Sequence, residues 1–131
     1  MTYPDVEKLL VSYLSEALQV RVVTDTPANL ERILPVVQVA RFGGEDTAPG
    51  IDRAIVDLDC YGSSRSAASE LAERVRYALL YRLAGTRVGD VAIPRVDTLT
   101  GPAWRPYDNS AIRRFGASYA LTTHAKTIRK D

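Results

Sequence analysis

The sequence predicts an α+β fold, with a mostly antiparallel sheet of four to five strands and two helices packed on one face. Three observations predict it. Apolar residues recur at helical spacing over residues 4–18 and 65–84. Strand-like alternation runs through residues 36–42, 53–61 and 111–124, and no repeat or low-complexity linker divides the chain. Short connections between consecutive strands favour antiparallel pairing, because a parallel pair needs a crossover of about a dozen residues.

The first helix is expected to run from Pro4, in its first turn, to about Leu18. Its apolar stripe comprises Val6, Leu9, Leu10, Tyr13, Leu14 and Ala17. A short β-branched strand is expected at residues 20–23, before the turn signal of residues 24–27. Residues 28–34 are ambiguous and are compatible with one helical turn.

The next segments predict two strands, at residues 36–42 and 53–61, joined by a glycine-containing loop over residues 43–52. In the second strand, one face carries Ala54, Val56, Leu58 and Cys60, and the other carries Ile55, Asp57, Asp59 and Tyr61. A helix then covers residues 65–84 and stops at Gly85. Its inward stripe comprises Ala68, Leu71, Ala72, Val75, Leu79 and Leu83.

The C-terminal third predicts two more strands. Residues 91–99 contain Pro94, which favours an edge position or a bulge. Residues 101–109 are expected to form a loop. In the strand at residues 111–124, Phe115, Ala117, Tyr119 and Leu121 share one face. The whole chain, 1–131, is expected to be a single domain, with residues 125–131 as a mobile charged tail.

The composition of the chain argues against several classes of function. Cys60 is the only cysteine, so no intramolecular disulfide can form, and a buried thiol is the expected state. No apolar run approaches the ~18 residues of a membrane span and no leader is evident, so an intracellular origin without membrane contact is expected. The net charge of +1 argues against a protein that binds nucleic acid by neutralising phosphates.

The charge is unevenly distributed along the chain. Residues 1–60 hold 5 basic and 10 acidic residues, and residues 61–131 hold 12 and 6. This polarity has two interpretations: identical subunits associate head to tail, or the charges cancel within one folded subunit.

The search for catalytic, metal or cofactor sites finds none. His124, the only histidine, has no cysteine or carboxylate at a motif-like spacing, and Gly43-Gly44 lacks the pattern of a phosphate loop. Asp57 and Asp59 lie on one strand face about 7 Å apart, like a metal-binding carboxylate pair. A nuclease would need more ligands. The pair is interpreted as a polar sheet face or as a surface for a neighbouring subunit's arginine.

The back of the second helix carries Glu70, Arg74, Tyr77 and Tyr81 where a solvated face is expected. Tyrosine and arginine are enriched in protein–protein interfaces. The sequence therefore predicts subunit contacts through this face. In the loop at residues 101–109, Trp104 and Tyr107 either fold back over the sheet or contact a partner.

The segments Leu-Pro-Val-Val-Gln-Val-Ala-Arg-Phe-Gly-Gly (34–44), Asp-Arg-Ala-Ile-Val-Asp-Leu-Asp-Cys-Tyr-Gly (52–62) and the helix from Ala67 to Leu83 resemble the tail terminator proteins of long-tailed bacteriophages, over residues 4–124. The resemblance implies a structural virion protein without an active site or cofactor. It implies a hexameric ring that caps the tail tube, ends its polymerisation and joins the tail to the head. The implied partners are other copies, the tail tube protein and a neck or head-completion protein, with DNA passing through the ring. The implied location is the tail–neck junction, after synthesis in the host cytoplasm.

Two sets of residues are predicted for these contacts. The subunit-interface candidates are Asp57, Asp59, Glu70, Arg74, Tyr77 and Tyr81. The partner-contact candidates are Arg41, Trp104, Arg105, Tyr107 and Arg114. Three alternatives stay open: another neck component such as a head-completion or stopper protein, a small metal-dependent nuclease or hydrolase, and an intracellular regulatory or nucleic-acid-binding module.

Overall fold

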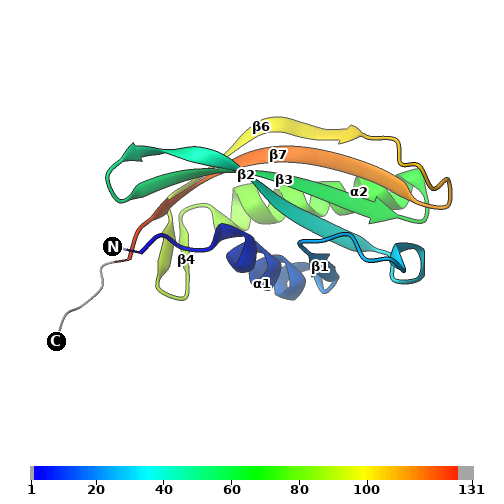
Figure 1. Cartoon of the computed structure of the whole chain (residues 1–131), viewed down its shortest axis with the longest axis horizontal. Coiled ribbons are helices and arrows are strands. Elements are labelled where there is room, and N and C mark those ends of the chain that lie inside the picture. The colour runs from blue at the N-terminus through cyan, green and yellow to red at the C-terminus, as the bar shows by residue number, and fades with distance from the viewer. Residues whose placement is uncertain (1, 127–131) are drawn as a thin grey trace.

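A curved sheet covers two helices in the computed structural model, which describes residues 2–126 (Figure 1). Within these residues the main sheet has five strands in the order β1-β2-β3-β7-β6, and a second sheet pairs β4 with β5. Only β1 and β2 are parallel in the main sheet. The elements are α1 (Val6–Leu18), β1 (Arg21–Val23), the 3₁₀ turn η1 (Leu30–Arg32), β2 (Val36–Ala48), β3 (Ile51–Gly62), α2 (Arg65–Tyr77), the π-helical turn η2 (Ala78–Leu83), β4 (Thr86–Val88), β5 (Val91–Ile93), β6 (Arg95–Trp104) and β7 (Arg113–His124). The predicted fold class is confirmed.

Both helices begin at capping side chains. The carboxylate of Asp5 accepts a hydrogen bond from the backbone N–H of Lys8, and the hydroxyl of Ser64 accepts one from Ala67, each at 3.1 Å. These caps satisfy N–H groups that lack a partner in the first turn. The second helix continues through η2, so its total span matches the predicted one to within a residue.

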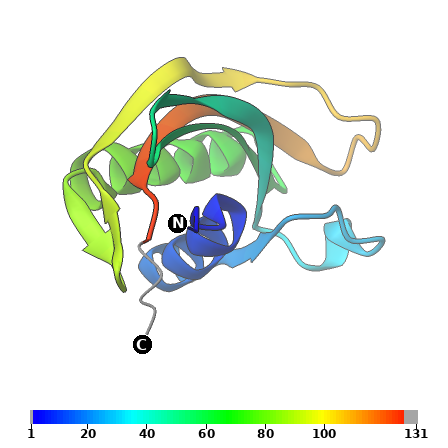
Figure 2. The same cartoon turned by 60° about the vertical axis from the view of Figure 1, so that its left-hand side comes forward.

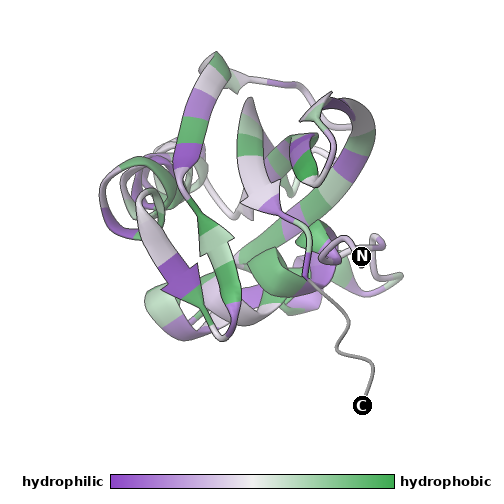
Figure 3. Ribbon diagram, turned by 90° about the vertical axis from the view of Figure 1, so that its left-hand side faces the viewer, coloured by the Kyte–Doolittle hydropathy of each residue, from purple (hydrophilic) through white to green (hydrophobic). Residues whose placement is uncertain are grey.

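The core lies between the helices and the inner face of the sheet, which is the face that α1 and α2 cover (Figure 2). Strand β3 alternates between buried and half-exposed residues, and this alternation of hydropathy is visible along the strands in Figure 3. The predicted inward residues of β3 are buried, as are those of the second helix. In α1, Ala17 is exposed and Leu18 takes its predicted place in the core. Each large apolar side chain buried here contributes about 1.5–3 kcal/mol.

The predicted loop over residues 43–52 is wrong, because β2 and β3 continue as a long hairpin. We call residues 42–52 the β2–β3 arm. The ladder shifts register between Arg41 and Gly44 and again between Asp46 and Ala48. A side chain at Gly44 would overlap the carbonyl of Arg53, and the φ of Gly44 is +130°. The glycine pair therefore forms a bulge that keeps the strands paired, where the sequence pattern indicates a loop.

Three predictions near the C-terminal half also need correction. Residues 101–104 are strand rather than loop, because two register shifts absorb Gly101 and Pro102 into β6. Strand β4 was not predicted, and β7 begins at Arg113 rather than at 111. Pro94 divides the predicted strand 91–99 into β5 and β6, and β6 is an edge strand, as the proline indicates.

The two ends of the described chain are joined to the body. Thr2 and Lys126 form an antiparallel bridge, and the N–H of Ala125 donates to the carbonyl of Gly50 at 2.7 Å. Ala125 and Lys126, the first residues of the predicted tail, are thus hydrogen-bonded. Residues 127–131 lie outside the described residues. In the part of the chain that the structure describes, no helix has the length and apolar composition to cross a membrane.

Candidate assembly surfaces

Four of the predicted interface residues form a stripe along the exposed side of the second helix. Glu70, Arg74, Tyr77 and Tyr81 are four, three and four residues apart, which places them on one side of a helix. We call these four residues the α2 stripe. The side chains of Tyr77 and Tyr81 are 58% and 75% exposed, and their rings stack with centroids 5.4 Å apart. Two stacked aromatic rings in solvent form an apolar surface that another protein can bury.

Two hollows flank this stripe, and Arg74 lines both. One, of about 350 Å³, lies between the end of α1 and α2, beside Leu18, Tyr77 and Ala78. The other, of about 360 Å³, lies between α2 and the segment that contains Glu31. The guanidinium of Arg74 donates to the carbonyl of Leu18 at 2.7 Å, which satisfies a carbonyl at the C-terminal end of α1. The stripe therefore lies on a helix that is hydrogen-bonded to the end of α1.

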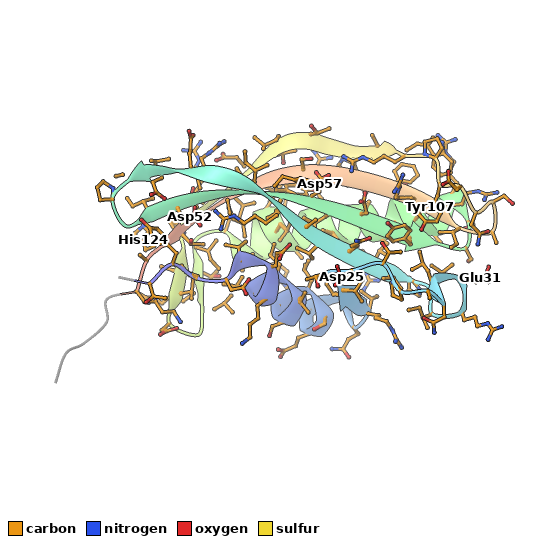
Figure 4. The ribbon with its side chains drawn as sticks, viewed as in Figure 1. Asp25, Glu31, Asp52, Asp57, Tyr107 and His124 are labelled. Atoms are coloured by element: carbon orange, nitrogen blue, oxygen red, sulfur yellow. The ribbon has the colours of Figure 1, made fainter. Side chains whose placement is uncertain are left out.

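The other two interface candidates, Asp57 and Asp59, lie on the outer face of the sheet, away from the helices, and Figure 4 labels Asp57. The guanidinium of Arg105 is 3.0 Å from the Asp59 carboxylate and 3.4 Å from that of Asp57. Ser118 also donates to Asp57. The arginine that faces this pair thus belongs to the same chain. It also occupies the position between two carboxylates that a divalent cation would take.

Gly116 makes room for this ion pair. Gly116 lies opposite Asp59 on the neighbouring strand β7. A side chain there would overlap both the guanidinium of Arg105 and the carboxylate of Asp59. Burial raises the pKa of Asp59, while the nearby charges of Arg105 and Arg114 act in the opposite direction. The outer face is thus polar, as predicted, and its charges are largely matched within the subunit.

The candidate Arg41 belongs to a second arginine–carboxylate site, at the base of the arm. Its guanidinium makes two hydrogen bonds to Asp52, at 2.8 and 2.9 Å, and Asp52 is only 4% exposed. The backbone N–H of Arg41 donates to Glu7 at 2.9 Å. Arg41 therefore joins β2, β3 and the start of α1, a structural role that the sequence did not indicate.

The aromatic candidates fold back onto their own chain. The ring of Trp104 meets that of Phe115 edge to face, with centroids 5.7 Å apart, and Arg65 lies over Trp104. Tyr107 packs against Tyr61 in the same manner, and Arg114 lies over Tyr107 at 5.1 Å. Of the two interpretations of these residues, the structure therefore shows the one in which they fold back over the sheet. Trp104 and Tyr107 remain partly exposed, and their contact with a partner stays a prediction.

The structure also exposes an aromatic residue that sequence reasoning missed. Phe42 is 65% exposed, at the start of the arm. Strand alternation places it on the outer face, because Val37 and Val39 are buried on the inner one. The signal was present in this alternation, but the following Gly43-Gly44 led to a loop assignment.

The remaining reactive side chains are isolated. Cys60 is buried in the core, and burial raises the pKa of its thiol well above the ordinary value, so it stays protonated. His124 is exposed at the end of β7. Within residues 2–126 no three histidine, cysteine or acidic side chains cluster closely enough to hold a metal ion.

The fold and these surfaces together indicate the class of protein. The chain is an α+β subunit whose exposed aromatic residues suit contact with other proteins. The sequence model of one family, described as phage tail termination protein, matches residues 2–126. The chain therefore belongs to the phage tail termination family, which confirms the resemblance found in its sequence. The family is one of structural proteins rather than enzymes, and its members are virion components that contact other tail or virion components. No curated protein matches the chain significantly.

Proposed function

We propose that this tail terminator protein forms a ring, with six subunits, that caps the tail tube and ends its polymerisation. The ring lies at the tail–neck junction, offers a surface for joining the head, and lets DNA pass through it. One observation carries the proposal: the α2 stripe exposes Tyr77 and Tyr81 as a stacked pair on a rigid helix. Such aromatic pairs provide much of the binding energy in protein interfaces.

A ring requires two different surfaces on each subunit, because each copy binds the next in a head-to-tail contact. The α2 stripe is the first surface. The outer face of the sheet, which carries Asp57 and Asp59, is the second. Arg105 balances one of the two negative charges of these carboxylates, and the exposed ring of Phe42 on the same face adds an apolar contact. The tube and neck proteins contact the residues at the rim of the sheet, with Arg41, Trp104, Arg105, Tyr107 and Arg114 as candidates.

The test replaces both tyrosines, as Tyr77→Ser with Tyr81→Ser. Both rings are exposed, so we expect the stability to change by no more than about 0.5 kcal/mol. We expect the variant to stay monomeric in light scattering and to leave purified tail tubes without a terminal ring in negative-stain images. Wild-type protein on the same tubes should show the ring.

The matched control is Leu99→Ser, which removes another exposed apolar side chain, 44% exposed on the edge strand β6. It should form rings like the wild type. Rings of unchanged mass from the double tyrosine variant would exclude the α2 stripe as the subunit contact.

The alternative functions have weaker support. The family match favours tail termination over head completion or a stopper role. For a nuclease, the guanidinium of Arg105 stands between Asp57 and Asp59, where a metal ion would have to bind.

A further inference from the structure

Two separate places on the described chain expose large aromatic side chains to a high degree. Phe42 lies on the β2–β3 arm, and Tyr77 and Tyr81 lie on the α2 stripe. Within residues 2–126, no other side chain covers either place. Two different apolar surfaces on one chain are what a head-to-tail contact between identical copies requires.

The arm cannot cover the stripe of its own subunit. Arg41, next to Phe42, is hydrogen-bonded to Glu7 in the first turn of α1. The hollow beside Tyr77 lies at the other end of α1, next to Leu18. Eleven residues of helix separate the two, a distance of about 17 Å. The arm also projects beyond both helices at the left of Figure 1, where a second copy can reach it.

The hollow between α1 and α2 can hold an aromatic ring. Its volume is about 350 Å³, and Leu18, Tyr77 and Ala78 form its apolar wall. An apolar cavity of about 150 Å³ is sufficient to bind benzene. A phenyl ring that entered this hollow would contact the ring of Tyr77 and lose its own exposure to water.

The charges of the two surfaces are complementary. The arm, residues 42–52, contains three acidic residues, Glu45, Asp46 and the buried Asp52, and no basic residue, although Arg53 just beyond it lies 4.0 Å from Glu45. The second helix, residues 65–83, carries four arginines and two glutamates. Arg74 and Arg82 line the hollow itself together with one acidic residue, Glu73, which leaves the hollow with an excess of one positive charge. Opposite charges at the rim of an apolar contact set its orientation and accelerate association.

We infer that the β2–β3 arm of one subunit docks on the α2 stripe of the next. Phe42 enters the hollow between α1 and α2, and the acidic tip of the arm lies against Arg74 and Arg82. This inference rests on the proposed ring and names the segment of the second copy that the stripe receives. It extends the outer-face surface from Asp57 and Asp59 onto the arm.

A thiol cross-linking experiment tests this pairing directly. The chain is prepared with Thr47→Cys, exposed on the arm, and Ala17→Cys, exposed beside the hollow, together and each alone, so that Phe42 and both tyrosines stay in place. Cys60 is buried with a raised thiol pKa, so the wild type serves as an unreactive control. With a short bismaleimide, the double variant should form a covalent ladder that ends at the ring size. Each single variant should stay monomeric, because its only accessible thiol faces a surface without one.

Four outcomes are informative. A ladder only from the double variant supports the inference. Dimers from Ala17→Cys alone would mean that two stripes face each other, which overturns it. No ladder from the double variant, while the wild type forms rings on tail tubes, would overturn the arm–stripe contact and leave the proposed ring intact. A wild type without rings on tubes would instead refute the proposed function.

A mixing experiment gives a second measurement that does not depend on cross-linking. Phe42→Ser should weaken self-association roughly tenfold or more, as expected for an aromatic anchor. Mixed with the Tyr77→Ser, Tyr81→Ser variant, it should form one-to-one dimers, because one copy retains the stripe and the other retains the arm. Leu99→Ser is again the control. Full rings from Phe42→Ser alone, or no dimers in the mixture, would contradict the inference.

Discussion

Two of the arginine–carboxylate sites in the described chain use the same kind of ion pair in different environments. Arg41 and Asp52 meet at the base of the arm, where the Asp52 carboxylate is almost fully buried. Arg105 meets Asp57 and Asp59 on the outer face of the sheet, where all three side chains remain partly in water. The first site joins elements and the second balances charge on a surface. Burial therefore decides how much each pair contributes to stability.

The largest effect is expected from Arg41→Met. It leaves the Asp52 carboxylate buried without its two hydrogen bonds, and removing one partner of a buried pair costs about 3 kcal/mol. Urea unfolding followed by circular dichroism would measure this loss.

The control for this variant is Arg95→Met, because the Arg95–Asp97 pair lies mostly in solvent. We expect a change of less than about 1 kcal/mol. Equal losses in the two variants would show that burial does not separate the sites.

An intermediate effect is expected from Gly116→Ala. The added methyl group would displace the Arg105 guanidinium from Asp59, because both groups occupy the space above Gly116. Because the displaced atoms are the ends of flexible side chains, the cost is mainly the loss of a partly exposed ion pair, about 1 kcal/mol. Gly101→Ala is the matched control, since a side chain there meets no atom within 4 Å. If both variants unfold at the same urea concentration, the missing side chain of Gly116 is not needed to position Arg105 beside Asp59.

The smallest effect is expected in the pH dependence of stability when Asp59 is substituted. Burial raises the pKa of Asp59 in the folded state above its ordinary value of 3.8. The folded state thus binds this proton more tightly than the unfolded state, so the contribution of Asp59 to stability is lost as the pH rises through its folded pKa. The variant Asp59→Asn should therefore gain stability relative to wild type over this range, and the gain should be constant at higher pH.

The control for the pH experiment is Asp90, because its pKa is shifted in the opposite direction and its substitution should have the opposite effect on stability. The ion pair with Lys126 lowers the pKa of Asp90. Asp90→Asn should lose stability relative to wild type at neutral pH, and the difference should vanish as the pH falls through the folded pKa of Asp90. Melting temperatures from pH 3 to 7 would measure both variants. A falling gain for Asp59→Asn with rising pH would contradict the burial argument.

Periodicity in the sequence was sufficient to predict the fold class. The stripes of both helices and the alternation in β3 depend on local spacing, which a sequence displays directly. The lengths of β2 and β6 could not be predicted in this way. Gly43, Gly44, Gly101 and Pro102 are typical of loops, and only pairing with a neighbouring strand turns them into bulges. The short strand β4 likewise could not be predicted from local spacing, because only its pairing with β5 makes it a strand.

The candidate surfaces were partly predictable for the same reason. Tyr77 and Tyr81 follow the spacing of a helix, so their common exposed side could be derived before the structure was known. The partner of Asp59 could not be, since Arg105 is 46 residues away in sequence. The exposure of Phe42 was hidden by the loop assignment of the residues that follow it.

The bridge between Thr2 and Lys126 has a practical consequence for engineering. Two backbone hydrogen bonds, at 2.9 and 2.7 Å, place the two ends of the described chain side by side. A short linker could join them, and new termini could be opened at Gly89, in the turn between β4 and β5. Circular permutation is tolerated where old termini are adjacent and new ones fall in an exposed turn. A fluorescent protein fused there would report on assembly while the arm and the α2 stripe keep their native sequence.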